Sequence, residues 1–436
     1  MSTSLALLGG KKIRETPFPA YKVIGEEEVA AATEVMRSGV LSRFIGAWCD
    51  DFHGGSQVKA FEKEWAAFMG TDHAIAINSC TSGLNAAVGA VGIEHGDEVI
   101  VSPYTMSASA VAPLHFGGIP VFADIDPDTY CLDPASIEDR ITKATRAIIV
   151  VHIFGRPANM DAIMAIAKKY DLKVIEDCAQ APGATYKGKR VGTIGDIGVF
   201  SFNYHKHIHT GEGGMVVTSN EQFAEKMQLI RNHAESVVER MGQTDIKNMV
   251  GQNYRMGEIE AAIGRRQLAK LTDLLQQRLA NVQYLEERLG DLPGLRFPAK
   301  EQDAEHVYYV HPIAYDESQL GLHRNKIVSA IKAELPDTEL REGEGGLIGA
   351  GYVRPLYLLP LFQRQIALGV EGAPFSSAKR DISALYQPGV CPHAEYAHTN
   401  SLITHEMMRP GMSRQDLDDV ALAFRKVWDN CSELAD

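Results

Sequence analysis

The sequence is poor in cysteine, and no two cysteines are close enough to form a CxxC motif. Its six cysteines are scattered along 436 residues: Cys49, Cys80, Cys131, Cys178, Cys391 and Cys431. This scatter argues against a zinc ribbon or a disulfide framework and favours free thiols in a reducing compartment. No apolar run approaches the roughly 20 residues that a membrane-spanning helix needs, and no secretory signal develops near the first residue. We therefore expect a cytoplasmic protein with no membrane partner.

Basic residues are also in deficit. The chain has 43 Lys and Arg against 56 Asp and Glu, which gives a formal net charge of −13. Because this charge repels phosphate backbones and no basic cluster offsets it, we expect no nucleic-acid partner. A hydrophobic content of 45% with 23% charged residues is typical of a soluble globular protein. The length favours two domains with separate cores.

Short apolar runs alternate with helical patterns from about residue 56 to 230, which indicates βαβ units on a largely parallel sheet. The predicted strands are residues 98–102, 120–123, 147–153, 173–176, 199–202 and 215–218, and the predicted helices are residues 58–69, 83–91 and 160–170. A longer helix is predicted over residues 257–289, where Asp291-Leu292-Pro293-Gly294 follows as a stop signal.

This pattern predicts a large α/β domain over residues 1–285 and a smaller C-terminal α+β domain over residues 286–436. In the smaller domain we predict a strand at residues 307–313 and a surface loop at residues 342–352. Its last helix should begin at Ser413, with Asp416 completing a capping box.

Residues 78–84 have the composition of a phosphate cradle. Asn78-Ser79-Cys80-Thr81-Ser82-Gly83-Leu84 follows a predicted strand and opens a predicted helix. The free N–H groups of a helix N-terminus and the hydroxyls of Thr81 and Ser82 favour a phosphate. Such a run is more often a simple N-cap, so it does not decide the function alone.

A carboxylate follows the predicted strand at residues 173–176. Asp177 comes directly after that strand, and Gln180 lies three residues later. Parallel sheets bind ligands at the carboxyl ends of their strands, and a carboxylate can keep a pyridine nitrogen protonated. Taken alone, Asp177 is more simply interpreted as a helix cap or a turn residue.

A lysine stands in the loop between the predicted strands at residues 199–202 and 215–218. Lys206 lies in an aromatic-rich segment that ends in Gly211-Glu212-Gly213-Gly214. Partial burial would lower its pKa toward the range in which the free amine is a nucleophile and forms an imine. A single lysine is usually a solvated surface charge, so other motifs must support this role.

Histidines flank the lysine at His205, His207 and His209. In a strand this spacing would place three imidazoles on one side. No further Cys or acidic ligand set accompanies them, so we expect no metal and favour substrate contact or packing.

Five motifs stand in an order that carries a resemblance. They are Thr81-Ser82, Glu176-Asp177 through Gln180, Ser201-Phe202 with Lys206, Gly211-Glu212-Gly213-Gly214 and Gln252-Asn253-Tyr254-Arg255. Together they resemble the DegT/DnrJ/EryC1/StrS family of sugar aminotransferases over nearly the whole chain. The resemblance implies an aspartate-aminotransferase-like fold (fold type I) with a mixed, mostly parallel sheet, and pyridoxal 5'-phosphate (PLP) as the cofactor.

The resemblance implies a role for each motif residue. Lys206 would hold PLP as a Schiff base, Asp177 would pair with the ring nitrogen, and Gln180 would contact the ring hydroxyl. Lys206 and Asp177 are thus the implied catalytic residues.

The other motifs would bind the remainder of PLP. Thr81, Ser82 and Ser201 would bind its phosphate, and Asn253 would reach the phosphate of a neighbouring subunit, which implies a homodimer with shared active sites. Where family members commonly stack an aromatic residue on the ring, this chain has Met106, whose thioether can also pack on a π-face.

The implied activity is transfer of an amino group from glutamate or glutamine to a keto-sugar. The turn at residues 104–108 and the long C-terminal unit resemble the branch that aminates an 8-oxo derivative of 3-deoxy-octulosonate, a lipopolysaccharide sugar acid. Nucleotide-linked keto-sugars and inososes stay open as acceptors. The candidates for substrate contact are His205, His207, His209, Arg231 and Arg255.

Two other functions fit the same fold. A PLP-dependent sugar 3-dehydratase carries histidine at the lysine position, but Lys206 lies five residues after Ser201 and six before Glu212, the spacing of the lysine-bearing branch. A PLP-binding regulator has no need to keep both Lys206 and Asp177. We therefore predict transamination.

Overall fold

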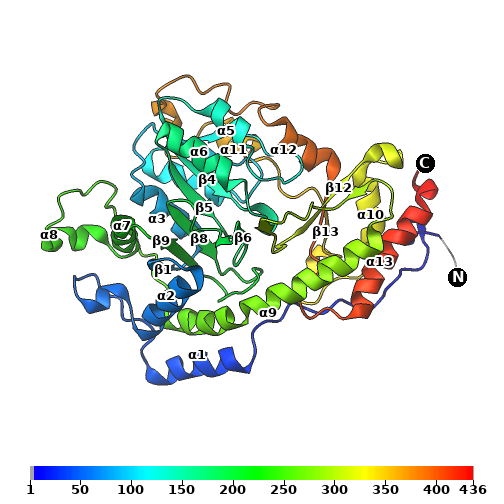
Figure 1. Ribbon diagram of the computed structural model, residues 1–436, viewed down its shortest axis with the longest axis horizontal. Coiled ribbons are helices and arrows are strands. Elements are labelled where there is room, and N and C mark those ends of the chain that lie inside the picture. The colour runs from blue at the N-terminus through cyan, green and yellow to red at the C-terminus, as the bar shows by residue number, and fades with distance from the viewer. Residues whose placement is uncertain (1–3, 436) are drawn as a thin grey trace.

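The computed structural model describes residues 4–435 and arranges them in a large and a small unit joined by a long helix (Figure 1). A seven-stranded sheet, in the order β1-β9-β8-β5-β4-β2-β3, is the centre of the large unit. Its strands are β1 His73–Ile77, β2 Glu98–Val101, β3 Ile119–Phe122, β4 Thr145–Val151, β5 Lys173–Asp177, β8 Ile197–Ser201 and β9 Gly214–Thr218. All neighbours are parallel except those of β9, which runs antiparallel to β1 and β8. This mixed, mostly parallel sheet confirms the predicted fold class.

The strands are continuous apolar runs because both faces of the sheet are covered. Along β1, Ile75 and Ile77 pack with the core that contains α3 (Cys80–Ala90) and α7 (Glu221–Arg231). Ala74 and Ala76 pack with the core that contains α2 (Ser56–Met69) and α9 (Glu258–Leu289). Each strand predicted in this sheet lies within two residues of an observed one. The helices of this unit are α1 Glu26–Ser38, α2 Ser56–Met69, α3 Cys80–Ala90, α4 Ala108–Val111, α5 Pro134–Arg140, α6 Met160–Tyr170, α7 Glu221–Arg231 and α8 Val238–Met241.

Helix α9, Glu258–Leu289, confirms the predicted long helix and links the two units. It packs on α1 and α2 of the large unit and on α13, Arg414–Asp429, of the small one. The predicted boundary at residue 285 falls inside this helix, and the division into two domains stays a prediction. The N-terminal segment also belongs to the small unit, since Leu5 and Phe18 lie in its hydrophobic core.

The small unit is built on an antiparallel sheet in the order β10-β12-β14-β13. Its strands are β10 Leu295–Arg296, β12 His311–Tyr315, β13 Ile348–Ala350 and β14 Leu402–His405, and its main helices are α10 Arg324–Glu334 and α13 Arg414–Asp429. A separate small sheet joins β6 Thr185–Tyr186, β7 Lys189–Arg190 and β11 Ala304–Glu305. The capping box of Ser413 and Asp416 is confirmed at the start of α13.

Two predictions for the small unit need correction. The strand predicted at residues 307–313 begins only at His311, because the N–H groups of Val307 and Tyr309 donate to the carbonyls of Gly155 and Phe154 in the large unit. The segment predicted as a loop at residues 342–352 contains β13, which gains its partners from β14. Neither pairing has a local sequence signal.

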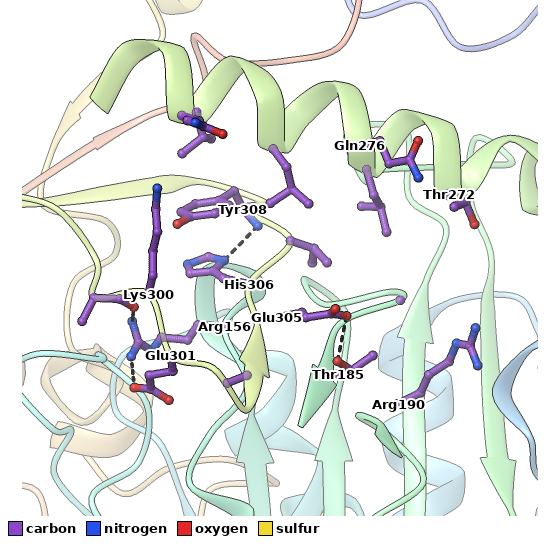
Figure 2. Close-up of a pocket in the computed structure, with 18 of the residues that line it drawn as sticks. Arg156, Thr185, Arg190, Thr272, Gln276, Lys300, Glu301, Glu305, His306 and Tyr308 are labelled. Carbon is purple, nitrogen blue, oxygen red and sulfur yellow. Dashed lines mark hydrogen bonds and ion pairs between the residues drawn. The ribbon is translucent and has the colours of Figure 1, made fainter. Parts of the chain in front are cut away.

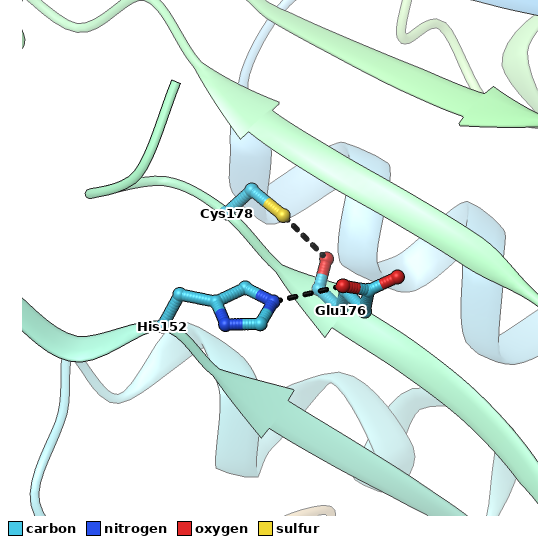
Figure 3. A group of neighbouring side chains, drawn as sticks. All are labelled: His152, Glu176 and Cys178. Carbon is cyan, nitrogen blue, oxygen red and sulfur yellow. Dashed lines mark hydrogen bonds and ion pairs between the residues drawn. The ribbon is translucent and has the colours of Figure 1, made fainter. Parts of the chain in front are cut away.

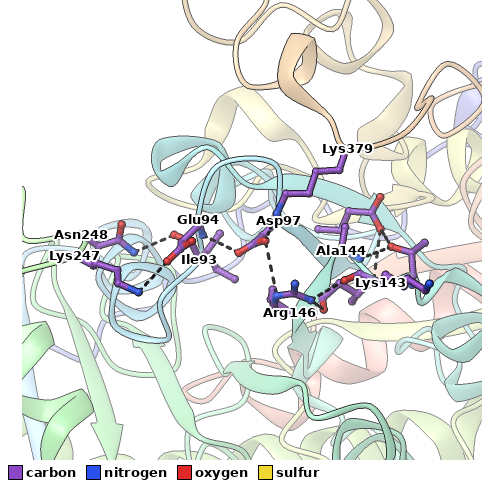
Figure 4. A network of polar contacts seen from close by, with 12 residues as sticks. Ile93, Glu94, Asp97, Lys143, Ala144, Arg146, Lys247, Asn248 and Lys379 are labelled. Carbon is purple, nitrogen blue, oxygen red and sulfur yellow. Dashed lines mark hydrogen bonds and ion pairs between the residues drawn. The ribbon is translucent and has the colours of Figure 1, made fainter. Parts of the chain in front are cut away.

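The segment from α11, Pro360–Gln363, to α12, Pro392–Tyr396, returns to the large unit. Lys379 Nζ lies 2.7 Å from Asp97 Oδ1, and Tyr386 donates to the carbonyl of Pro120 at 2.9 Å. Figure 4 shows Asp97 between Lys379 and Arg146, within a polar network that continues through Glu94. This network fixes the segment beside β2. Within residues 4–435, no helix has both the length and the apolar character required to cross a membrane.

Candidate active site

Lys206 lies in the turn that follows β8 and is 9% exposed. Its Nζ atom lies 4.2 Å from the centre of the Tyr309 ring. Burial lowers the pKa of Lys206, and the negative charge of Asp177 only partly opposes this shift. The amine is therefore more nucleophilic at neutral pH than a surface lysine.

Asp177 ends β5 at the edge of the sheet where ligands are expected, and it is 4% exposed. Ser109 donates its hydroxyl to Oδ2 at 2.7 Å, and the N–H of Ala179 donates to Oδ1 at 3.0 Å. The Cys80 thiol donates to the same oxygen over 3.9 Å. These donors hold the carboxylate in one orientation.

Glu176, one residue earlier, braces this end of β5 from the opposite face. It accepts hydrogen bonds from the N–H groups of Gly192, Ile194 and Gly195, and from His152 Nε2 at 2.9 Å (Figure 3). Because His152 Nδ1 accepts from the N–H of Ala158, the proton of the neutral imidazole is on Nε2. Burial opposes ionisation of Glu176, but these donors keep its pKa below the usual value.

Figure 3 also shows Cys178 beside this pair. His152, Glu176 and Cys178 bring their ligand atoms within 4.8 Å of one another, so their residue types could hold a metal ion. The imidazole and the carboxylate are engaged with each other, and the thiol donates to the Glu176 carbonyl at 3.7 Å. All three side chains are therefore engaged in hydrogen bonds that stabilise this end of β5.

Gln180 is held at both ends of its amide. Its Oε1 accepts from the N–H of Phe154 at 2.7 Å, and its Nε2 donates to the Tyr352 hydroxyl at 3.0 Å. The N–H of Tyr352 donates in turn to the Tyr104 hydroxyl at 2.9 Å. These hydrogen bonds connect the loop after β5 with the small unit and with the turn after β2.

The predicted phosphate-binding residues gather at the start of α3. Ser79 caps the helix by accepting from the N–H of Ser82 at 3.1 Å, which is why α3 begins earlier than predicted. Thr81 is exposed in the first turn, whereas Ser82 is buried. Ser201 pairs with Gly214 across β8 and β9, and a Cβ atom on Gly214 would lie 2.7 Å from the Ser79 carbonyl carbon. Only glycine permits this approach, which brings Ser201 beside the helix N-terminus.

Met106 and Asn253 are both exposed. Met106, in the turn after β2, is 64% exposed. Asn253 follows α7 and α8, and its carbonyl accepts from the Asn78 side chain at 3.3 Å. The backbone of Asn253 is therefore fixed to the loop before α3. Its side chain is exposed and accessible to a neighbouring subunit.

The three histidines lie in the loop between β8 and β9 and do not form a strand. The N–H of Lys206 donates to the Asn203 carbonyl at 2.9 Å, which makes this segment a turn. His207 is buried and its Nε2 lies 3.0 Å from the Val307 carbonyl. His205 and His209 are partly buried; burial lowers both pKa values, that of His205 to about 4.

The candidate arginines occupy a different region. Arg231 is fully buried and donates to Glu62 at 2.6 Å and to the Ala76 carbonyl at 3.0 Å. Arg255 is partly buried, and burial together with the charge of Arg231 lowers its pKa. Arg231 is thus engaged with the β1 region, and a substrate role for either arginine stays a prediction.

Several residues of the site had no signal in the sequence. Tyr309 faces the lysine, Ser109 holds Asp177, and Tyr352 holds Gln180. A charged cluster of the small unit lies nearby and contains Arg341, Glu344, Glu406 and Arg409. Each comes from an element far from Lys206 along the chain, so only the folded structure brings it near.

A separate cavity lies beneath α9. It has a volume of about 610 Å³, and its lining includes Arg156, Arg190, Lys300 and His306 (Figure 2). Neither Lys206 nor Asp177 lines it. It is therefore separate from the candidate site.

The residues around Lys206 fit PLP. The cofactor requires an amine, an acid for its ring nitrogen and donors for its phosphate. The structure offers a desolvated amine, a carboxylate held by Ser109 and a helix N-terminus with the exposed Thr81 hydroxyl. The roles of the individual residues stay predictions.

Comparison with known proteins gives a consistent result. Residues 22–365 match the DegT/DnrJ/EryC1/StrS aminotransferase family. The spore coat polysaccharide biosynthesis protein SpsC of Bacillus subtilis is 34% identical over 412 residues, which cover 93% of this chain and 95% of that protein. The L-glutamine:2-deoxy-scyllo-inosose aminotransferase of Streptomyces paromomycinus is 31% identical over 440 residues and 98% of both chains.

A solved structure supports the same fold. The aminotransferase from Psychrobacter cryohalolentis is 31% identical and superposes with a TM-score of 0.80, covering 95% of this chain and 99% of the other. The similarity therefore includes the small unit as well as the large one.

Proposed function

The chain belongs to the DegT/DnrJ/EryC1/StrS aminotransferase family, and from this premise we propose that it transfers an amino group from glutamine or glutamate to a keto-sugar or an inosose. It is a PLP-dependent aminotransferase of sugar metabolism. The observation that carries the proposed site is the desolvated Lys206 amine at the edge of the sheet where Asp177 ends β5.

PLP supplies a carbonyl carbon that accepts an amine and a pyridine ring that withdraws electrons. Lys206 Nζ would hold PLP through that carbon, and as a free amine it would take the α-proton of the donor and deliver a proton to the product carbon. Asp177, fixed by Ser109, would hold a proton at the ring nitrogen.

The amino donor is proposed from the relatives. The inosose aminotransferase named above takes its amino group from L-glutamine, as its name states. We favour glutamine for this chain and keep glutamate as the alternative.

The acceptor is proposed at the level of its class. An inosose or a nucleotide-linked keto-sugar agrees with the relatives, and the 8-oxo-octulosonate suggested by the turn at residues 104–108 stays a prediction. The lysine at position 206 disfavours the 3-dehydratase, and the retained Asp177 disfavours a purely regulatory PLP-binding protein.

A homodimer is proposed as the functional unit. Apolar side chains of α1 and the segments on either side of it are exposed: Ile24, Val29, Met36, Val40, Leu41 and Ile45. Val29 and Met36 are seven residues apart and therefore share one face of α1. An apolar surface of this kind is typical of a protein interface.

The test combines trapping and turnover. Borohydride reduction followed by peptide mapping should place the pyridoxyl group on Lys206, and Lys206→Ala should lose both this adduct and transamination. A panel of keto acceptors, each assayed with glutamine and with glutamate, should identify the substrates. Transfer by the Lys206→Ala variant, or a deoxy-sugar product without consumption of the donor, would contradict the proposal.

A further inference from the structure

The cavity beneath α9 lies between a helix and a sheet (Figure 2). Its volume of about 610 Å³ is that of a pocket for a small-molecule ligand. One wall is the face of α9 that carries Thr272, Gln276 and Leu279, which are four and three positions apart. The opposite wall is the three-stranded sheet of β11, β6 and β7. A ligand in the cavity would contact both elements.

Three polar side chains form a row across that sheet. Glu305 of β11 is paired with Thr185 of β6, and Thr185 is paired with Arg190 of β7. Because directly paired residues have their side chains on the same face, all three are directed into the cavity that they line. Neighbouring strands lie about 4.8 Å apart, so the row extends over about 10 Å from a carboxylate through a hydroxyl to a guanidinium.

This row has hydrogen-bonding capacity left at both ends. The Thr185 hydroxyl donates to Glu305 Oε2 at 2.7 Å, and Oε1 has no donor among the residues that the structure describes. The Cζ atom of Arg190 lies 4.3 Å from the centre of the Phe68 ring, and within residues 4–435 the guanidinium has no hydrogen-bond acceptor. The cavity therefore offers an acceptor at one end of the row and donors at the other.

The charges around the cavity balance. Three carboxylates and three cations line it, namely Glu286, Glu301, Glu305, Arg156, Arg190 and Lys300. A multiply charged ligand such as a nucleotide would therefore meet like charges. A hydroxyl group both donates and accepts hydrogen bonds, so a polyhydroxylated ring satisfies both ends of the row. The C–H faces of such a ring can pack on Phe68 and on Leu279, which is 39% exposed.

Val307 connects the cavity to Lys206. It lines the cavity, and its carbonyl accepts a hydrogen bond from Nε2 of His207, the residue after Lys206, at 3.0 Å. Two residues further along the chain, the Tyr309 ring lies over Lys206 Nζ. A ligand that fixes this segment therefore acts on two direct neighbours of the reacting amine.

We propose that this cavity is a regulatory site that binds a polyhydroxylated ring, namely a sugar or a cyclitol. Binding depends on the cavity alone, whereas its effect on amino transfer rests on the proposed function. The proposed reaction yields an aminated sugar or cyclitol, so the product itself belongs to the class of ligand that the cavity fits. The single ammonium group of that product has the carboxylate of Glu305 as a partner. Occupation of the cavity would adjust the reactivity of Lys206 to the amount of product.

Binding measurements test the site without turnover. myo-Inositol and methyl glucoside, which carry no amino or keto group, are each titrated calorimetrically into the PLP-loaded enzyme. Arg190→Leu and Glu305→Gln should each weaken binding of at least one of them by about 10-fold or more, because each removes a charged hydrogen-bonding group. The matched control is Lys189→Leu, since Lys189 is the exposed neighbour of Arg190 in β7 and lies on the opposite face. This control should bind both polyols like the wild type.

Kinetics test the regulatory effect. With the amino donor at saturation, the bound polyol should change kcat of the donor half-reaction by about 2-fold or more in the wild type and should have no effect in Arg190→Leu. Retention of the PLP adduct on Lys206 in Arg190→Leu shows that the active site is folded. Equal affinity of Arg190→Leu and the wild type for both polyols, or no binding by the wild type, overturns the site.

A polyol that only raises the KM for the donor overturns the regulatory effect, because it then competes at the active site. Absence of amino transfer by the wild type overturns the proposed function instead, and the binding measurements still decide whether the cavity is a polyol site.

Discussion

The Lys206 Nζ atom lies over the ring of Tyr309, 4.2 Å from the ring centre, where the two units meet. The N–H of Tyr309 donates to the Phe154 carbonyl at 2.7 Å, so the tyrosine is fixed to the edge of the large sheet. The ring face favours the ammonium form of the lysine, whereas burial disfavours it. Burial is the larger effect, since the pKa of Lys206 is lowered.

Removal of the Tyr309 ring should lower the pKa of the Lys206 amine further. A cation–π contact contributes on the order of 1 kcal/mol, so Tyr309→Leu should shift this pKa down by about 0.7 unit. The rate at which the apoenzyme takes up PLP, followed by absorbance against pH, reports the free amine. Its acidic limb should move down in Tyr309→Leu and stay in place in Tyr309→Phe. If the acidic limb of the uptake rate does not move in Tyr309→Leu, or moves to higher pH, the Tyr309 ring does not favour the ammonium form of Lys206.

Asp177 should be essential for activity. Ser109, which donates a hydrogen bond to Asp177, should make a smaller contribution to activity. A neutral amide does not keep the ring nitrogen protonated, so Asp177→Asn should lower kcat/KM by about 100-fold or more. Ser109→Ala keeps the carboxylate but removes one hydrogen bond to a charged group, which predicts a loss of about 10-fold. Steady-state assays of both variants check this order. Equal losses would show that the hydroxyl does more than orient Asp177.

The large sheet and the order of its motifs were predictable because their signals are local. A parallel strand buried on both faces is a continuous apolar run, and its carboxyl end is marked by the polar residue that follows. Asp177 is the last residue of β5, and Lys206 lies in the loop that follows β8, so both lie at the carboxyl end of a parallel strand. The start of the last helix at Ser413 was predictable for the same reason, since a cap is a local hydrogen bond.

The parts that were missed depend on contacts between distant segments. Tyr309 and Tyr352 reach the site only because loops of the small unit pair with the turn after β4 and with Gln180. The positions of the histidines beside Lys206 depend on how the predicted loop closes on itself, with the N–H of Thr210 donating to the Phe202 carbonyl. The spacing of the histidines alone does not indicate this closure.

Asn253 should act in the active site of the neighbouring subunit. Lys206→Ala and Asn253→Asp should each be nearly inactive, the second because its charge repels a phosphate. When equal amounts are mixed and allowed to exchange subunits, half of the dimers should pair one variant with the other, and each such dimer has one intact site. Activity should then recover to about a quarter of the wild-type value. No recovery after verified exchange would assign Asn253 to its own subunit.

His405 should make the protein sensitive to acid. Its Nε2 lies 2.8 Å from His311 Nδ1, and its Nδ1 accepts from the N–H of Met407, so a second proton would break that bond. Burial and the neighbouring His311 hold the pKa of His405 well below its usual value. Below about pH 6.5 the unfolded chain binds a proton at this position that the folded chain does not, so stability falls as pH falls.

Urea unfolding at pH 7.5 and pH 5.5 measures this effect. Between these two values the His405 contribution to the free energy of unfolding should fall by about 1.4 kcal/mol. The His405→Gln variant should be less stable than the wild type at pH 7.5, but it should lose about that much less on acidification. The exposed His115→Gln serves as the control and should follow the wild type at both pH values. The same acid loss in His405→Gln and the wild type would show that this imidazole takes up its proton without unfolding, and that the His311 contact does not prevent it.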